Sequence, residues 1–293
     1  MNILFIGSVK FSEYALKQLI DMQADVIGVC SAPSSTINSD HADLSLIADR
    51  FQIPCRSTPD INHPEVISWI QNLNPDIIFC FGWSQLIKKQ LLAIPPMGIV
   101  GYHPSYLPLN RGRHPLIWAL VLGLEETAST FFFMDEGADS GDILSQVPVI
   151  IEKSDSASDL YKRITTVAME QIREFVPSLS TNTYERIPQI HTSSNTWRKR
   201  GIPDGIIDWR MAAVSIHNLV RGLSHPYIGA QFSYNGTTFK VWKTEIENNA
   251  PNNLEPGKVL AVSSKNILVK SGLDAIRICE IEPNINLKPG DYL

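Results

Sequence analysis

Short, predominantly apolar runs alternate with helical patterns in the first part of the chain. The runs cover residues 2–6, 26–30 and 75–81, and apolar residues recur at helical spacing between Phe11 and Met22. Continuous apolar runs are typical of strands buried on both faces of a parallel sheet. Strand, helix and strand joined by short turns form a βαβ unit. The pattern therefore predicts an α/β fold with a doubly wound, mostly parallel sheet and right-handed crossovers.

The remaining pattern extends this sheet and adds a second domain. Further helices are predicted over residues 44–51, 64–73, 116–122 and 156–175, and further strands over 99–100, 129–134 and 147–151. Alternating strands over 239–242, 258–261, 267–270 and 275–281 predict a small open β-barrel. Residues 178–201 are rich in Ser, Thr, Asn and Pro, which is typical of a linker. We therefore expect an N-terminal domain over 1–180, a linker over 181–205 and an OB-like β domain over 206–293.

Composition and charge fit this two-domain prediction and limit the partners. The chain has 293 residues, of which 44% are hydrophobic and 19% charged, enough to bury a substantial core. Its net charge of −5 provides no whole-molecule attraction for nucleic acid or for an anionic membrane, although it leaves a local basic patch open. The four cysteines have no C-x-x-C spacing, so we interpret them as small buried hydrophobic residues rather than metal ligands.

The N-terminus and the hydropathy predict a cytoplasmic protein. Residues 1–7 read as a first strand, because they lack the basic region and the long apolar stretch of a signal peptide. No apolar run approaches the ~20 residues that a membrane span requires. Scattered, unpaired cysteines suit a reducing compartment. Gly7-Ser8 carries a single glycine, so no dinucleotide-binding fingerprint follows the first strand.

The stretch from Ile99 to Leu144 contains the candidate chemistry. His103 lies at the end of an apolar strand, and Asp139 lies in a turn bounded by glycines. Prolines at positions 104, 108 and 115 stiffen the loop that follows the histidine. A histidine at a strand end with an aspartate in a later turn is where a paired His/Asp site would lie. Taken alone, however, such a histidine is more often a hydrogen-bonded residue without a catalytic role.

Three sequence blocks in this stretch resemble the signature of the folate-dependent formyltransferases. They read His103-Pro104-Ser105-x-Leu107-Pro108, Arg111-Gly112-x-x-Pro115 and Asp139-Ser140-Gly141. That group includes methionyl-tRNA formyltransferase, the sugar-nucleotide N-formyltransferases and, more distantly, glycinamide ribonucleotide formyltransferase. The text from Ile206 to Ala230 also resembles the start of the family's C-terminal domain. The resemblance implies a Rossmann-like catalytic domain and N10-formyltetrahydrofolate as the formyl donor.

The resemblance also implies roles for individual residues. His103 would transfer protons as general acid and base, and Asp139 would orient its imidazole and favour the protonated form. The segment around Phe81 forms part of the pterin pocket in the family, largely through backbone groups. For Phe81, Trp83 and Ile87, ordinary core packing remains an equal alternative. The full set expected to bind the folate comprises Phe81, Gly82, Trp83, Ile87, Gly141 and Asp142.

The acceptor is expected to contact a second set of residues. An arginine fork suits a diphosphate or a carboxylate, so Arg111 and Arg113 are expected either to bind a nucleotide or to form structural pairs. For the C-terminal candidates, packing or surface roles are a strong alternative. The expected acceptor-binding set comprises Ser105, Asn110, Arg111, Arg113, His114, Arg221 and Tyr227.

Gly101 is the departure from the family pattern. The family has Asn two residues before the histidine, where it donates a hydrogen bond to the formyl oxygen, and loss of such a donor typically costs a few kcal/mol of transition-state stabilisation. Three explanations are open. Another donor (Ser105, Asn110, His114 or water) substitutes, main-chain N–H groups suffice, or the protein is an altered transferase. We favour substitution, because the other blocks of the signature are intact.

The charge pattern favours a nucleotide-linked amino sugar as the acceptor. The polar stretch from Ser31 to Asp43 reads as an exposed loop, where methionyl-tRNA formyltransferases carry a basic insertion that holds tRNA. Here no Lys or Arg occurs between Lys17 and Arg50, which disfavours a nucleic acid partner. Such an activity would serve surface-polysaccharide synthesis, including lipopolysaccharide. Methionyl-tRNA is the second candidate, a non-catalytic folate- or nucleotide-binding protein is the alternative of another class, and the oligomeric state, a homodimer included, stays open.

Overall fold

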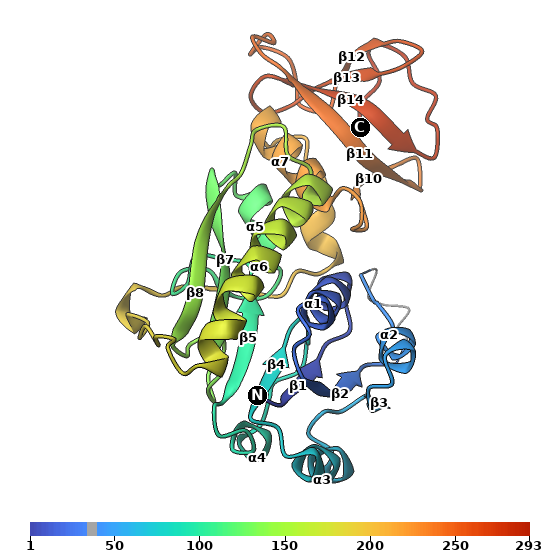
Figure 1. Cartoon of the computed structure of the whole chain (residues 1–293). Helices are drawn as coiled ribbons and strands as arrows, with labels where there is room; N and C mark the ends of the chain where they lie inside the picture. Colours follow the sequence, from blue (N-terminus) through green and yellow to red (C-terminus); the bar gives the residue numbers. More distant parts are fainter. Residues whose placement is uncertain (34–39) are drawn as a thin grey trace. The chain divides into compact units, whose positions relative to one another are not determined.

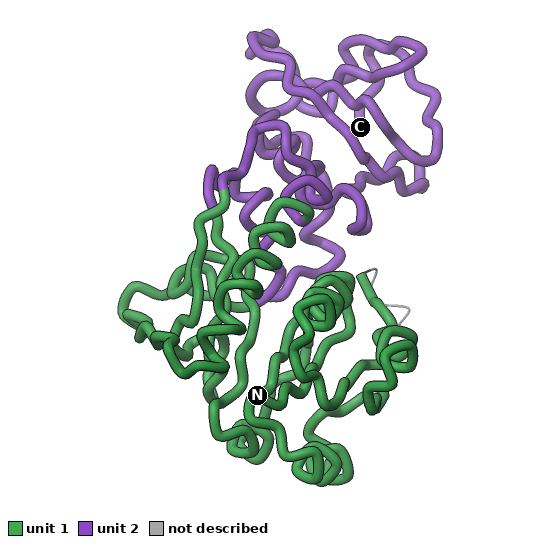
Figure 2. The backbone as a smooth tube through the Cα atoms, viewed as in Figure 1, with its two compact units in different colours: residues 1–112, 127–149, 162–197 green, residues 113–126, 150–161, 198–293 purple. Residues whose placement is uncertain are grey.

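The computed structural model describes residues 1–33 and 40–293 (Figure 1). Part of the loop predicted over Ser31 to Asp43, residues 34–39, lies outside the described residues. The chain forms two compact units, coloured separately in Figure 2. Unit 1 contains residues 1–112, 127–149 and 162–197, and unit 2 contains residues 113–126, 150–161 and 198–293.

Unit 1 is built on a seven-stranded sheet with the order β3-β2-β1-β4-β5-β7-β8. Neighbouring strands from β3 to β5 are parallel, whereas β7 runs antiparallel to β5. This sheet confirms the predicted α/β fold with a mostly parallel, doubly wound sheet. The strands are β1 (Ile3–Ile6), β2 (Val26–Ser31), β3 (Cys55–Ser57), β4 (Ile77–Cys80), β5 (Ile99–His103), β7 (Glu126–Phe133) and β8 (Ile143–Ile150).

The helices connecting these strands bury one apolar face each. In α1, Phe11, Leu16 and Leu19 lie in the core. α3 begins at Pro64, and the residue that follows its end, Asn74, is left-handed; both are favoured residues at these positions. The helices are α1 (Lys10–Asp21), α2 (Ser45–Arg50), α3 (Pro64–Leu73), α4 (Lys89–Leu92) and α6 (Ala157–Ser180). Among the described residues, none of the helices combines the length and the apolar character needed to cross a membrane.

Aromatic side chains fix the end of β4 within the core of unit 1. Phe81 stacks on Phe79 with ring centroids 5.3 Å apart and meets Phe131 of β7 edge-on at 5.1 Å. Phe131 in turn contacts Phe175 of α6 at 4.8 Å. Such pairs contribute beyond their buried area. The strand end from which the predicted folate segment leaves is therefore rigidly placed.

Unit 2 contains a five-stranded antiparallel sheet and two packed helices. The strand order is β10-β11-β14-β13-β12, which confirms the predicted C-terminal β domain. Gly222 allows α7 to approach α5 closely, because a Cβ there would meet Val121 at 3.0 Å. Trp209 lies in the core of this unit. The elements are α5 (Pro115–Val121), α7 (Ala213–Leu223), β10 (Ala230–Tyr234), β11 (Thr237–Glu247), β12 (Val259–Val262), β13 (Ile267–Lys270) and β14 (Ala275–Glu282).

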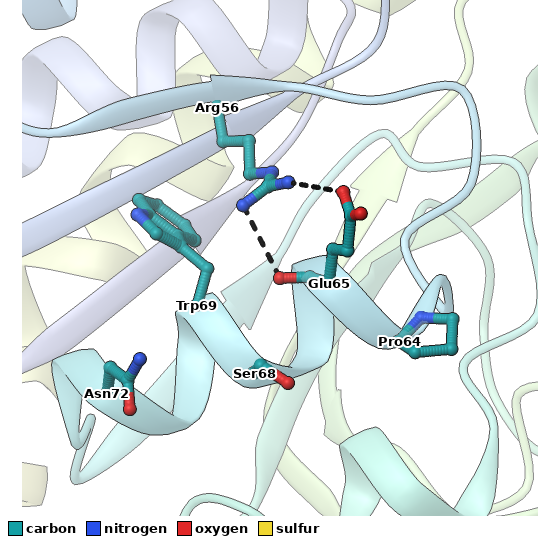
Figure 3. Close-up of a pocket in the computed structure, with 6 residues that line it drawn as sticks. All are labelled: Arg56, Pro64, Glu65, Ser68, Trp69 and Asn72. Carbon is teal, nitrogen blue, oxygen red and sulfur yellow. Dashed lines mark hydrogen bonds and ion pairs between the residues drawn. The ribbon is translucent and has the colours of Figure 1, made fainter.

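A surface cavity of about 470 Å³ lies beside the edge strand β3 and helix α3 (Figure 3). Its wall is held by Arg56, which donates hydrogen bonds at 3.3 Å to both the carboxylate and the carbonyl of Glu65. Trp69 and Asn72 of α3 complete the lining with Pro64 and Ser68. None of these residues belongs to the predicted site, so this cavity is distinct from it.

Candidate active site

Three parallel strands end at the same edge of the sheet in unit 1. β4 lies between β1 and β5, with Cys80 paired with Ile6 on one side and with Gly101 on the other. The chain order reverses between β1 and β4, so this edge is the topological switch point, where ligands bind in open α/β sheets. The segments that leave these strands begin at Gly7, Phe81 and His103. Their common edge brings the predicted folate segment and the predicted catalytic histidine together.

His103 is the last residue of β5 and is 5% exposed. Its Nε2 lies 2.8 Å from the carbonyl oxygen of Asn110. Because a carbonyl can only accept, Nε2 carries the proton and donates this hydrogen bond. Nδ1 faces the Oδ2 of Asp139 at 3.6 Å. The two predicted catalytic residues are therefore adjacent, although 36 positions separate them in the sequence.

Asp139 is held in place by its own backbone and by the loop after His103. Its φ of +53° is left-handed, a conformation that Asp tolerates better than most residues. Its Oδ2 accepts a hydrogen bond of 2.9 Å from the backbone N–H of Gly112. Gly141 allows the chain to pass the carbonyl oxygen of Phe133, with which a Cβ would clash. Next to it, the carbonyl of Asp142 accepts from the N–H of Phe133 at 2.8 Å.

The space beside Gly101 is filled by apolar side chains. A Cβ at this position would lie 3.0 Å from both Phe132 Cζ and Met134 Cγ. Phe132 is the partner of Gly101 across the antiparallel β5–β7 pair. Because side chains two residues apart share one face of a strand, this aromatic ring lies on the same face as His103. The ring of Phe132 therefore fills the volume that a side chain at position 101 would need.

Ser105 and Asn110, which were proposed to replace the missing donor, already form hydrogen bonds with other residues. The Ser105 hydroxyl is fully buried and donates to the carbonyl of Leu109 at 3.2 Å. The backbone N–H of Asn110 donates to Oδ1 of Asn195 at 2.8 Å, and its carbonyl accepts from His103. His114 belongs to unit 2. The hydroxyl of Ser105 is thus already engaged in the structure of its own loop.

The predicted folate-binding residues divide into core and surface positions. The side chains of Phe81 and Ile87 are buried in the hydrophobic core. Gly82 has a φ of +68°, and a Cβ there would clash with Val9, so only glycine fits this turn. The indole nitrogen of Trp83 is buried without a hydrogen-bond partner, although its side chain is partly exposed. A buried unpaired N–H is costly, and a bound ligand carbonyl would satisfy it.

The first turn of α1 supports this predicted folate segment. The hydroxyl of Ser12 donates to the carbonyl of Phe81 at 2.6 Å and accepts from the N–H groups of Ser8 and Val9. The hydroxyl of Ser8 donates to the carbonyl of Gly82 at 3.4 Å. These bonds fix the backbone of residues 81–82. The glycine at the turn, the fixed backbone and the unpaired indole N–H would suit the binding of a flat, polar heterocycle at this edge of the sheet.

The predicted acceptor-binding residues are divided between the two units. Arg111 is 8% exposed, and its Nη2 donates to Gln189 and to His191. Arg113, His114, Arg221 and Tyr227 belong to unit 2. Arg113 is exposed, and Tyr227 packs against the core of that unit. Arg221 donates to the carbonyls of Glu152 and Asp155, and its Nε donates to Asn218.

His114 provides a testable pH dependence. Burial, followed by the charge of Arg113, lowers the pKa of His114 below its ordinary value. The unfolded chain therefore binds a proton more readily, and stability is lost as the pH falls through about 6.5. Because His114 has a φ of +58°, Asn is a well-matched replacement. In His114→Asn, urea unfolding at about pH 7.5 and about pH 5.5 should show a smaller loss of stability on acidification.

A second histidine also contributes to the pH dependence of stability. Burial also lowers the pKa of His217, so it contributes with the same sign and remains in the variant. The pH slope is therefore expected to shrink rather than vanish. A slope in His114→Asn equal to that of the natural protein would contradict the assigned role of His114.

Three residues that contact Asp139 or the loop after His103 were not found by sequence reasoning. Gly112 donates to the carboxylate of Asp139, Gln189 donates to its carbonyl, and Asn195 accepts from the N–H of Asn110. Gly112 lies inside the Arg-Gly block, so its motif was the only available signal. Gln189 and Asn195 lie in a polar stretch without periodicity, which offered none.

Comparison with known proteins identifies the family of the chain. Residues 1–176 match the model of the formyl transferase family, and residues 203–288 match that of the formyl transferase C-terminal domain. The chain is 32% identical over 286 residues to methionyl-tRNA formyltransferase of Geobacter metallireducens, covering 96% of this chain and 91% of that protein.

Solved structures share the fold at lower identity. A sugar 3-N-formyltransferase, WlaRD, crystallised with dTDP and 5-N-formyltetrahydrofolate, superposes with a TM-score of 0.72 at 17% identity, covering 97% of this chain and 99% of that one. The N-formyltransferase of Helicobacter canadensis gives 0.70 at 18% identity, covering 94% and 98%. With both of its domains matched, the chain belongs to the formyl transferase family, enzymes that use N10-formyltetrahydrofolate as the formyl donor.

Proposed function

We propose that this formyltransferase acts on a primary amine and that His103 and Asp139 carry the proton transfers. The supporting observation is the adjacency of the two side chains, with Nδ1 of His103 3.6 Å from Oδ2 of Asp139. Formyl transfer to an amine requires a base for the attacking nitrogen and an acid for the leaving nitrogen. One imidazole can serve both steps, because it can accept a proton and later return it.

The hydrogen bonds assign the proton to one nitrogen. N10-formyltetrahydrofolate supplies the formyl group whose carbonyl carbon the amine attacks. Because Nε2 donates to Asn110, the free lone pair of neutral His103 is on Nδ1, which accepts the amine proton. The resulting imidazolium faces the carboxylate of Asp139, which stabilises its charge. Nδ1 then returns the proton to the departing nitrogen.

Residues at the strand ends are the proposed folate site. The backbone of Phe81 and Gly82 is fixed by Ser8 and Ser12, and the indole N–H of Trp83 is available as a donor. Gly141 and Asp142 follow the catalytic aspartate in the same turn. Ile87 supports the segment from the core. These features support binding of the pterin mainly by backbone groups, with Trp83 as the side-chain contact.

Methionyl-tRNA is the acceptor that the sequence comparisons support best. The relatives that are 29–32% identical over 286 residues are methionyl-tRNA formyltransferases, and the match covers 96% of this chain. Identity spread over both domains, rather than over the motif alone, favours a similar acceptor. This acceptor was the second candidate from the sequence.

A nucleotide-linked amino sugar stays the second candidate because of one observation. No lysine or arginine occurs between Lys17 and Arg50, where a tRNA-binding segment would need positive charge. The net charge of −5 points the same way. A small acceptor, formylated for surface-polysaccharide synthesis, requires no extended basic surface.

One incubation distinguishes these acceptors. The protein is mixed with N10-formyltetrahydrofolate and either charged initiator methionyl-tRNA or a panel of aminodeoxy sugars linked to dTDP, UDP and GDP. Mass spectrometry then detects the formyl increment on the acceptor, and absorbance detects release of tetrahydrofolate. Formylated methionyl-tRNA supports the first candidate, and a formylated sugar supports the second. No folate product with any acceptor would contradict turnover and leave a binding protein.

A further inference from the structure

A polar segment of unit 1, residues 186–197, lies against both loops that carry the catalytic pair. Ile187 pairs with Ile143 by two backbone hydrogen bonds of 2.8 and 2.9 Å, just after the Asp139 turn. β9 (Thr196–Trp197) pairs with β6 (Arg111–Gly112), in the loop after His103. The segment thus contacts the aspartate side at one end and the histidine side at the other.

Gln189 is the side chain that joins the two sides. It is 7% exposed, and its side chain forms hydrogen bonds with Arg111, Asp139 and Gly141. Its Nε2 donates to the carbonyl of Asp139 at 3.0 Å and to the carbonyl of Gly141 at 2.7 Å. Its Oε1 accepts from Nη2 of Arg111 at 2.6 Å. One amide therefore fixes the aspartate turn and anchors it to the loop after the histidine.

The bonds form a closed circuit that joins Asp139 to the loop after His103. Arg111 is followed by Gly112, whose N–H donates to Oδ2 of Asp139 at 2.9 Å. Gly112 has a φ of +101°, and a Cβ there would clash with the carbonyl of Trp197, so glycine is needed for the close approach of the loop to β9. Movement of the Gln189 amide would change the position of the carboxylate relative to the imidazole.

We propose that Gln189 is a positioning residue that holds the Asp139 carboxylate against the His103 imidazole. The inference rests on the proposed function, since it assigns a partner to that pair. The Gln189 amide takes no part in the proton transfers. It acts by fixing the carbonyls on either side of the turn and the guanidinium of Arg111. Small displacements of a catalytic group lower the rate strongly, so its loss should slow turnover more than it weakens donor binding.

The first test measures geometry without any acceptor. Amide hydrogen exchange of Gly112, followed by NMR, reports the bond to Asp139. In Gln189→Leu, which keeps the volume and removes three hydrogen bonds, exchange of this amide should be at least ~10-fold faster. Gln171→Leu is the matched control, because Gln171 is also buried and bonds elsewhere, to Ser129 and Ser145. Equal exchange in the two variants would overturn the proposal.

The variant Gln189→Glu separates the bond to Arg111 from the bonds to the carbonyls of Asp139 and Gly141. A glutamate still accepts from Arg111 but has no donor for the carbonyls of Asp139 and Gly141. Fast exchange of Gly112 in this variant is the expected result. Exchange at the natural rate would show that only the Arg111 bond matters, which contradicts positioning of the aspartate turn. This variant also provides the comparison if the leucine protein does not fold.

Kinetics with the acceptor found in the incubation above give the second readout. Gln189→Leu should lower kcat by ~10-fold or more while the KM for N10-formyltetrahydrofolate changes by less than ~2-fold. In an Asp139→Asn background the same change should add less than ~2-fold, because the two residues act together. Equal, independent losses in both backgrounds would refute the inference. Full activity of Asp139→Asn itself would instead refute the proposed function, whereas the exchange result would stand.

Discussion

His103→Ala is expected to lower kcat by at least ~100-fold, the lower end for loss of a general acid and base. The imidazole is the group that can accept and return a proton next to Asp139, with Nδ1 3.6 Å from the carboxylate. Alanine removes both proton transfers and also leaves the carbonyl of Asn110 without its donor. The rate is measured as tetrahydrofolate release under saturating donor, with the KM determined separately.

Asp139→Ala is expected to cause a loss of similar size, at least ~100-fold in kcat. The variant removes the charge that faces the imidazolium and the acceptor for the Gly112 N–H. His63→Ala and Glu136→Ala are the controls, because both side chains are exposed and lie outside the site. Their rates should match that of the natural protein. A His103 or Asp139 variant that retains activity would refute the role assigned to that residue.

The fold was predictable because its signal is local. The run from Pro75 to Phe81 is apolar, and the structure places β4 inside it at Ile77–Cys80. A strand covered on both faces must be apolar at consecutive positions, so composition alone marks it. The helix α7 (Ala213–Leu223) was not predicted, because its N-cap residue, Ala212, provides no side-chain hydrogen bond and the helix follows a loop rich in turn residues.

The site was predictable only in part, since its contacts join distant positions. His103 and Asp139 were predicted from their motif blocks, and the structure places them next to each other. Gln189 was not, although it is buried, because polar residues in a non-periodic stretch predict a loop exposed to water. Its partners Arg111 and Asp139 lie 78 and 50 residues away in the sequence. No local pattern encodes such a contact, and only the folded chain brings the three together.

Gly101→Asn is expected to lower both stability and activity rather than restore a missing donor. The new side chain would enter a volume held by Phe132 and Met134, which lie 3.0 Å from the position of its Cβ. Overpacking of this kind costs about 1–3 kcal/mol of unfolding free energy. Displacement of Phe132 on β7 would also disturb the face that carries His103, so kcat should fall by ~10-fold or more.

The double variant Gly101→Asn, Phe132→Ala tests whether the two positions share one volume. Phe132→Ala alone leaves a cavity and should cost about 3–5 kcal/mol. Together the changes should cost less than their sum by about 0.5–3 kcal/mol in a double-mutant cycle, because the asparagine fills the space that the ring vacates. Urea unfolding measures the stabilities, and tetrahydrofolate release measures the rates. Additive losses, or a gain of activity in the single Gly101→Asn variant, would contradict this prediction. Either result would mean that the space beside His103 is open to a donor side chain and is not filled by Phe132.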